Sequence, residues 1–104
     1  MYLLNTTFVI HPDVFGNWKK FIKQVYIPLS LDEIKFEGVK VMKIHSEQEG
    51  GELTYSVQYK TPHKENIKFF QDQIQPRLHR ELGKVFGETV MPFSTLLQEV
   101  QLDE

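Results

Sequence analysis

The sequence predicts an α+β domain of the ferredoxin-like class, in which a four-stranded antiparallel sheet carries two helices on one face in the order β-α-β-β-α-β. Three observations lead to this prediction. Residues 52–59 alternate between polar and apolar side chains, as a strand covered on one face does. Apolar residues recur every three or four positions after Pro12 and again after Pro62, which is typical of amphipathic helices. Two adjacent glycines, Gly50 and Gly51, join two strand-like segments as a tight hairpin.

The first strand and the first helix occupy the opening third of the chain. Residues 2–10 alternate between two partly apolar sets, so we expect a strand with both faces at least half covered. Pro12 and Asp13 suit the first turn of a helix. We expect Pro28 to stop or kink this helix, with a short extra turn in residues 29–34. The helix is expected to bury one apolar face, made of Val14, Phe15, Trp18, Phe21, Ile22, Val25 and Tyr26.

The hairpin and the second helix follow in the middle of the chain. Strands are expected over residues 39–49 and 52–59, on either side of the two glycines. Thr61 is expected to cap the second helix, with Pro62 at its first position. The apolar face of this helix comprises Ile67, Phe70, Ile74, Leu78, Leu82, Val85 and Phe86.

The second helix contains an internal proline. Because Pro76 lacks a backbone donor and its ring clashes with the previous turn, we expect a kink or a break near Gln75. Gly87 is placed to end the helix as a C-terminal cap. A fourth strand is expected over residues 90–100, before a short polar tail.

The two faces of the sheet differ in character. The handedness of βαβ crossovers places the first and third strands in the centre and the others at the edges. The apolar face, expected under the helices, has Leu4, Phe8, Ile10, Leu53, Tyr55, Val57 and Tyr59. The opposite face is mixed, with Leu3, Asn5, Thr7, Val9, Thr54, Ser56 and Gln58. It has too little charge for a solvated surface, so we expect a second copy to cover it. We therefore predict a homodimer that buries Asn5, Thr7, Ser56 and Gln58.

Length and composition limit the class of protein. A chain of 104 residues is expected to form one domain, residues 1–104. The formal net charge of −2 gives no electrostatic attraction to nucleic acid or to an anionic membrane, so we expect neither as a partner. Cysteine is absent, which excludes disulfides and thiolate metal sites and fits a reducing compartment. With no basic, apolar leader and no apolar run of about 20 residues, the cytoplasm is the expected location.

The chain as a whole resembles a family of short, uncharacterised bacterial proteins known only as a domain of unknown function. The resemblance rests on Asn5-Thr6-Thr7-Phe8, Trp18, Ile27-Pro28 and the segment GELTYSVQY at 51–59, together with Tyr2, Phe86-Gly87 and Phe93. It covers nearly all of the chain. It implies a ferredoxin-like fold of the dimeric α/β-barrel type, and it implies no activity.

Candidate binding residues are few. The four histidines have neither the spacing nor the neighbouring carboxylates of a metal site, so we expect no metal and no cofactor. Trp18, Tyr55 and Tyr59 are expected between the sheet and the helices. There they could line a pocket for a small-molecule ligand, or they could fill the core.

Two classes of function follow from these observations. The first is a non-enzymatic homodimer that senses a ligand or binds another protein. The alternative is a monooxygenase-like enzyme of the dimeric α/β-barrel type, either cofactor-free or haem-dependent. The resemblance to that fold implies, for the haem form, a site built from Asn5, Phe69 and His79, with phenylalanine where such enzymes have tryptophan. The wheel of the second helix instead turns His79 towards solvent, and alternation places Asn5 on the face away from the helices.

Overall fold

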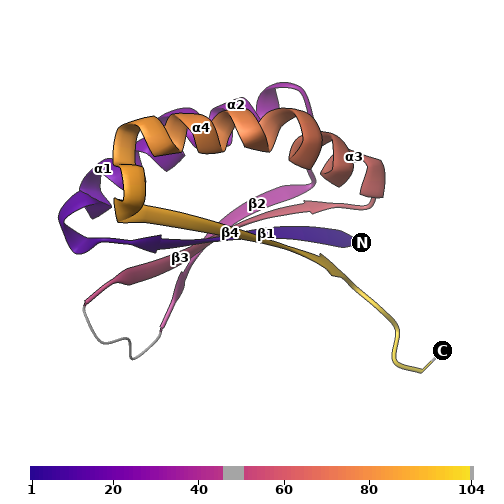
Figure 1. Ribbon diagram of the computed structural model, residues 1–104. Helices are drawn as coiled ribbons and strands as arrows, with labels where there is room; N and C mark the ends of the chain where they lie inside the picture. The colour runs from indigo at the N-terminus through magenta and orange to yellow at the C-terminus, as the bar shows by residue number, and fades with distance from the viewer. Residues whose placement is uncertain (46–50, 104) are drawn as a thin grey trace.

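The computed structural model describes residues 1–45 and 51–103 and has the expected ferredoxin-like arrangement (Figure 1). The strands are β1 (Tyr2–Ile10), β2 (Gly38–Ile44), β3 (Leu53–Thr61) and β4 (Val90–Gln98). They form one antiparallel sheet in the order β2-β3-β1-β4. The predicted placement of the first and third strands in the centre, and of the other two at the edges, is thus confirmed.

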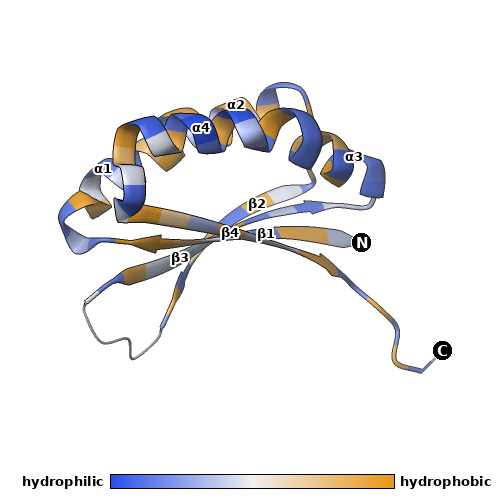
Figure 2. Ribbon diagram, viewed as in Figure 1, coloured by the Kyte–Doolittle hydropathy of each residue, from blue (hydrophilic) through white to orange (hydrophobic). Residues whose placement is uncertain are grey.

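Two helical stretches cover one face of this sheet (Figure 1). The first comprises η1 (Pro12–Val14), α1 (Phe15–Phe21), η2 (Ile22–Tyr26) and α2 (Ile27–Asp32). The second comprises α3 (Lys64–Phe69), η3 (Phe70–Ile74), α4 (Gln75–Phe86) and η4 (Gly87–Thr89). Figure 2 shows hydrophobic and hydrophilic residues alternating along both stretches, as amphipathic helices require.

The core lies between the helices and the sheet. Every second residue of β1 is fully buried there, beginning at Leu4 and ending at Ile10. The ring of Phe8 packs between Trp18 of α1 and Tyr26 of η2, with centroids 5.4 and 5.5 Å away. The expected apolar face therefore does lie under the helices, and aromatic rings fill much of it.

Both internal prolines are accommodated by a wider, π-helical turn, so neither ends its helix. The helix does not stop at Pro28 but continues through η2, in which the N–H of Ile27 bonds to the carbonyl of Ile22, five residues back. It does not break near Gln75 either, and continues through η3, where the N–H of Gln75 bonds to the carbonyl of Phe70. Each π-turn ends immediately before the residue that precedes the proline. A wider turn removes the clash between the proline ring and the carbonyl four residues earlier.

Element boundaries differ from the predictions at the hairpin and at the start of the second helix. β3 extends to Thr61, so this residue ends a strand and does not cap a helix. The N-cap is His63, and the Thr61 hydroxyl accepts hydrogen bonds from the His63 amide and the Asn66 side chain, at 3.1 and 3.3 Å. β2 ends at Ile44. The predicted strand residues 46–49 and the turn residue Gly50 lie outside the described residues, and Gly51 has the positive φ, 75°, expected of a hairpin glycine.

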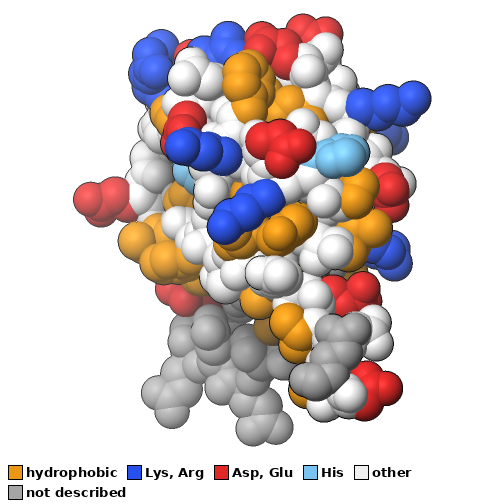
Figure 3. Space-filling view, turned by 90° about the vertical axis from the view of Figure 1, so that its right-hand side faces the viewer, with side chains coloured by type: hydrophobic (Ala, Val, Ile, Leu, Met, Phe, Trp, Pro, Cys, Tyr) orange, Lys and Arg blue, Asp and Glu red, His pale blue; other side chains and the backbone are white. Residues whose placement is uncertain are grey.

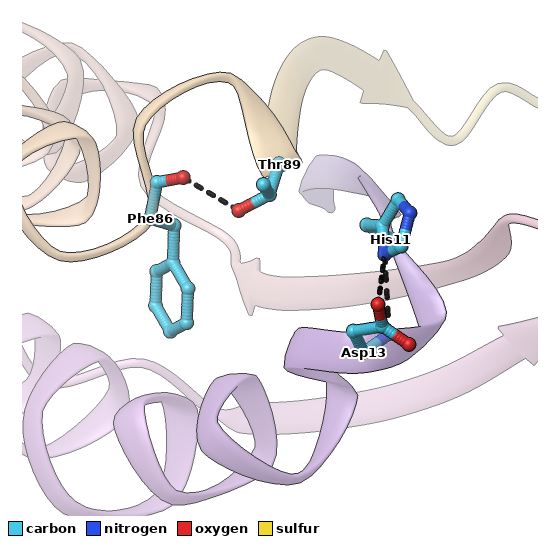
Figure 4. A network of polar contacts seen from close by, with 4 residues as sticks. All are labelled: His11, Asp13, Phe86 and Thr89. Carbon is cyan, nitrogen blue, oxygen red and sulfur yellow. Dashed lines mark hydrogen bonds and ion pairs between the residues drawn. The ribbon is translucent and has the colours of Figure 1, made fainter.

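Polar contacts order the chain at the end of β1 and the start of β4, and Figure 4 shows those between His11 and Asp13 and between Phe86 and Thr89. The amide of His11 donates to the carbonyl of Thr89 at 2.9 Å, and the imidazole Nδ1 of His11 accepts from the amide of Asp13 at 3.2 Å. The Thr89 hydroxyl donates to the carbonyl of Phe86 at 2.5 Å. Gly87 follows with φ of 57°, so the predicted glycine cap is confirmed. These contacts fix the chain where it leaves α4 and enters the edge strand.

Candidate functional site

The face of the sheet that no helix covers, called the open face below, is the first candidate site. Antiparallel register places its residues in four rows across β2, β3, β1 and β4. The two central rows are mainly polar: Lys40, Gln58, Asn5 and Thr95, then Met42, Ser56, Thr7 and Phe93. The outer rows are mainly apolar: Ile44, Thr54, Val9 and Met91 at one end, and Gly38, Lys60, Leu3 and Leu97 at the other.

Hydrogen bonds organise the centre of the open face. The Ser56 hydroxyl donates to Asn5 Oδ1, and Asn5 Nδ2 donates to Thr7 Oγ1 at 3.1 Å. Gln58 lies directly opposite Asn5 in the register of β1 and β3. The structure therefore brings together Asn5, Thr7, Ser56 and Gln58, the four residues expected at a dimer contact. The bonds among Asn5, Thr7 and Ser56 hold the Asn5 amide and the two hydroxyl groups in fixed positions.

Large apolar side chains surround this polar centre. Phe93 is 54% exposed, and Met91 and Leu97 on the same edge strand are also exposed. Met42 and Ile44 continue the apolar surface on β2, at the opposite edge. Isolated exposed apolar residues are normal, but a set gathered on one flat face marks a surface for association.

The proposed pocket residues divide between two aromatic clusters. Trp18 packs on Tyr55 with ring centroids 5.4 Å apart, and Phe15 lies against both. Tyr59 packs instead on Phe36 and Phe70, with centroids 4.9 and 5.0 Å away. The rings fill the space between sheet and helices. The indole Nε1 of Trp18 is buried and has no hydrogen-bond partner within the described part of the chain.

The three residues of the haem pattern point in different directions. Asn5 lies on the open face, whereas its neighbour Thr6 contacts the helical layer through Gln75. Phe69 is exposed and lines a surface groove with Gln73, Arg77 and Arg80. The sheet separates Asn5 from His79, so the three side chains do not converge on one ligand.

His79 is not the solvent-facing residue that the helix wheel predicts. Its imidazole is more than half buried, stacks on Tyr26 at a centroid distance of 6.0 Å, and lies with Nε2 3.2 Å from the Tyr26 hydroxyl. Burial lowers the pKa of His79, so the neutral ring is favoured. The wheel turns His79 away from the buried Leu78, but it takes no account of the neighbouring helical stretch, whose Tyr26 covers the imidazole.

A polar cluster of buried Thr6 and Gln75 with the exposed Ser94 lies on the helix side of the sheet, and sequence reasoning missed it. Gln75 Nε2 donates to Thr6 Oγ1 at 3.2 Å and to Ser94 Oγ at 2.8 Å, which links α4 to β1 and β4. The Thr6 and Ser94 hydroxyls lie 3.1 Å apart. Burial raises the pKa of Tyr26, whose hydroxyl contacts the same cluster, to about 12. Pro76 was the nearby signal in the sequence, since the π-turn before it is followed at once by Gln75, which is buried.

A second polar chain connects β3 with the first helical stretch. The Tyr59 hydroxyl donates to Ser30 Oγ at 2.7 Å, and the Ser30 hydroxyl donates to the carbonyl of Tyr26 at 2.6 Å. All three residues are fully buried, and burial raises the pKa of Tyr59 well above its usual range. Both phenols therefore stay protonated and act as structural hydrogen-bonding groups in the core.

Searches for two further kinds of site gave negative findings. In residues 1–45 and 51–103, no three His, Asp or Glu side chains gather in a group that could hold a metal ion. No helix in the same residues combines the length and the hydrophobicity needed to cross a bilayer.

Comparison with family models gives one match. The model described as "Domain of unknown function (DUF4286)" matches residues 1–100. The chain belongs to this family. The predicted resemblance to a family of unknown function is thus confirmed, and no curated protein matches the DUF4286 chain at a significant level.

Solved structures share the fold of this DUF4286 chain at low sequence identity. An ethyl tert-butyl ether D (EthD) family protein from Bacillus halodurans is 14% identical with a TM-score of 0.64, and the match covers 96% of this chain and 100% of that one. The de novo designed protein Foldit4 is 15% identical with a TM-score of 0.58, covering 95% and 98% of the two chains. At these identities the likeness concerns the fold alone.

Proposed function

We propose that this DUF4286 chain acts as a homodimeric binding domain without enzymatic activity, which associates through its open face and serves a small-molecule ligand or a protein partner. The observation that carries the proposal is the composition of that face. It combines exposed hydrophobic residues such as Phe93 and Met91 with a hydrogen-bonded centre around Asn5. Interfaces between protein chains have this combination of apolar area and positioned polar groups.

Isologous pairing is the simplest way to cover such a face. In a two-fold dimer, both copies use the same surface, so the open face of each copy covers the open face of the other. The polar centre then fixes the register of the two sheets, while the apolar residues provide most of the association free energy. The absence of cysteine from the chain fits a reducing compartment, and we propose the cytoplasm.

Two matched variants test the open-face dimer. Phe93→Glu places a charge on the open face, and Val85→Glu places the same charge on the outer surface of α4, where the side chain is 60% exposed. Light scattering over a wide concentration range should show a dimer for the wild type and for Val85→Glu. Phe93→Glu should be monomeric with unchanged circular dichroism. A wild-type protein that is monomeric at every concentration would contradict the proposal.

The alternative function, a monooxygenase-like enzyme, has one supporting observation. The chain shares its fold with a protein of the ethyl tert-butyl ether D family. The residues do not fit haem, because Asn5 and His79 are on opposite sides of the sheet and Nε2 of His79 faces the Tyr26 hydroxyl. A haemin titration tests the haem-dependent form of this alternative. We expect no saturable Soret shift, and a shift of one haemin per chain that is lost in His79→Ala would favour the enzyme.

A further inference from the structure

We propose that residues 99–103, the segment that follows β4, lie on the open face of the partner protomer in the dimer. This inference rests on the proposed open-face dimer and adds a named contact to it. The segment is called the post-β4 segment below. Its sequence, Glu-Val-Gln-Leu-Asp, alternates acidic or polar residues with two apolar ones.

The post-β4 segment leaves the sheet towards the same side as the open face. Its last backbone contact with the sheet is the hydrogen bond from the Glu99 amide to the Met1 carbonyl, at 3.0 Å. Beyond this bond the chain runs away from the helices, on the side of the sheet that they leave uncovered (Figure 1). Val100 is exposed and Leu102 is 98% exposed, so neither side chain packs on its own protomer. Two apolar side chains projecting in this way are suited to a partner surface.

The distribution of charge indicates that the partner surface is the open face of the second protomer. Among the sixteen open-face positions of the four strands, the charged residues are Lys40 and Lys60, and both are exposed. Pairing two such faces brings four lysines together and no strand carboxylate, which is unfavourable. The post-β4 segment carries Glu99 and Asp103 at the edge of this face. Its carboxylates supply the opposite charge that the paired faces lack.

A groove at the same end of the sheet is suited to receive the segment. It has a volume of about 240 Å³ and is lined by Leu3 and Leu97, with Lys60 and Glu99 among its other residues. Figure 3 views the molecule from this end and shows hydrophobic side chains among basic and acidic ones. A two-fold axis parallel to the strands brings the same ends of two sheets together. Each post-β4 segment then reaches the partner's groove, with Leu102 on its apolar walls and Asp103 near Lys60.

Crosslinking between two single-cysteine chains tests this contact directly, because the natural chain has no cysteine. Leu102→Cys chains are mixed with size-tagged Lys60→Cys chains, exchanged and oxidised. The control replaces Lys60→Cys with Val85→Cys on the outer surface of α4. We expect a mixed disulfide between the Leu102→Cys and Lys60→Cys chains and at least tenfold less with the control. Equal yields for the two pairs, or no mixed disulfide although the wild type is a dimer, would overturn the inference.

A second measurement separates this inference from the dimer itself. The double variant Val100→Ser, Leu102→Ser keeps the charges and removes the apolar contacts, while Leu31→Ser on α2 changes another exposed leucine. We expect the dimer dissociation constant from sedimentation equilibrium to rise at least tenfold for the double variant and to be unchanged for Leu31→Ser. A dimer as tight as the wild type would refute the post-β4 contact and leave the open-face dimer standing. A monomeric wild type would refute both.

Discussion

The two faces of the sheet are made by the same strands, and yet they are completed in different ways. On the helix face, Phe8 is fully buried by Trp18 and Tyr26 of the same chain. On the open face, Phe93 of the neighbouring strand is 54% exposed. Since strand side chains alternate with a period of two, adjacent residues of one strand take part in these two different surfaces. The helix face therefore provides the folding free energy of the protomer, and the open face is available for association.

The polar groups follow the same division. Thr6, Gln75 and Ser94 bond to one another on the helix side of the sheet, and burial makes the bond between Gln75 and Thr6 costly to lose. Asn5 and Thr7 bond to each other on the open face and keep contact with solvent. Hydrogen bonding on the helix face stabilises the fold. Hydrogen bonding on the open face orders a surface that a partner can recognise.

The largest expected difference comes from truncating one phenylalanine on each face. Phe8→Ala should lower the free energy of unfolding by about 3–5 kcal/mol, because it leaves a cavity among buried aromatic rings. Phe93→Ala should change the stability of the monomer by less than about 0.5 kcal/mol, as exposed substitutions do. Chemical denaturation at low protein concentration measures both.

The two variants should also differ in how their loss of stability depends on protein concentration. The loss caused by Phe8→Ala should be the same at all concentrations, since the residue lies inside the protomer. For Phe93→Ala, the loss should grow with concentration because the proposed dimer buries that side chain and the monomer does not. Equal losses for the two variants at low concentration would show that the open face is part of the protomer's own core.

The architecture could be predicted from the sequence because its signals are local. The alternation in 52–59 and the helical spacing around Trp18 each need only a few neighbouring residues, and they gave the right order of strands and helices. The strand order followed from a general rule of handedness. The assignment of Leu4 and Phe8 to one face and of Asn5 to the other followed from alternation alone.

The candidate site was harder to predict because two of its determinants are not local. A proline within an apolar run predicts a break, and the choice of a π-turn at Pro28 and Pro76 depends on packing against the sheet. His79 faces Tyr26 and not solvent because the two helical stretches pack side by side, a contact between residues 53 positions apart in the sequence. Ser94 joins the polar cluster only through strand pairing, and nothing near it in the sequence indicates this.

A threonine on each face provides the second comparison. Thr6→Val should cost roughly 1–2 kcal/mol, since it removes a buried hydroxyl that accepts from Gln75 and lies beside Ser94. Thr7→Val loses only the half-buried bond from Asn5 and should cost less than about 0.5 kcal/mol in the monomer. Urea denaturation of both variants at low concentration gives the difference. A cost for Thr7→Val as large as that for Thr6→Val would mean that the open-face network stabilises the protomer.

The smallest expected effect is a dependence of stability on pH that originates under the helices. Burial lowers the pKa of His79 below its ordinary value of 6.5, whereas the unfolded chain regains that value. As the pH falls from about 6.5 towards the lowered pKa, the unfolded state therefore binds more protons than the folded state, and stability decreases. Above pH 6.5 the ring is neutral in both states, and its contribution is constant.

Replacing the imidazole should remove this part of the pH dependence. His79→Gln is expected to be less stable than the wild type at pH 8, because it loses the stacking on Tyr26, and to show a shallower decrease in stability between pH 6.5 and 5. His63→Gln, at the exposed N-cap of α3, controls for the loss of a histidine elsewhere. Thermal unfolding of the three proteins across pH 5–8 measures the slopes. A wild-type slope as shallow as that of His79→Gln would mean that the imidazole is solvated when charged, and that the helix face does not exclude water at this point as it does around Phe8.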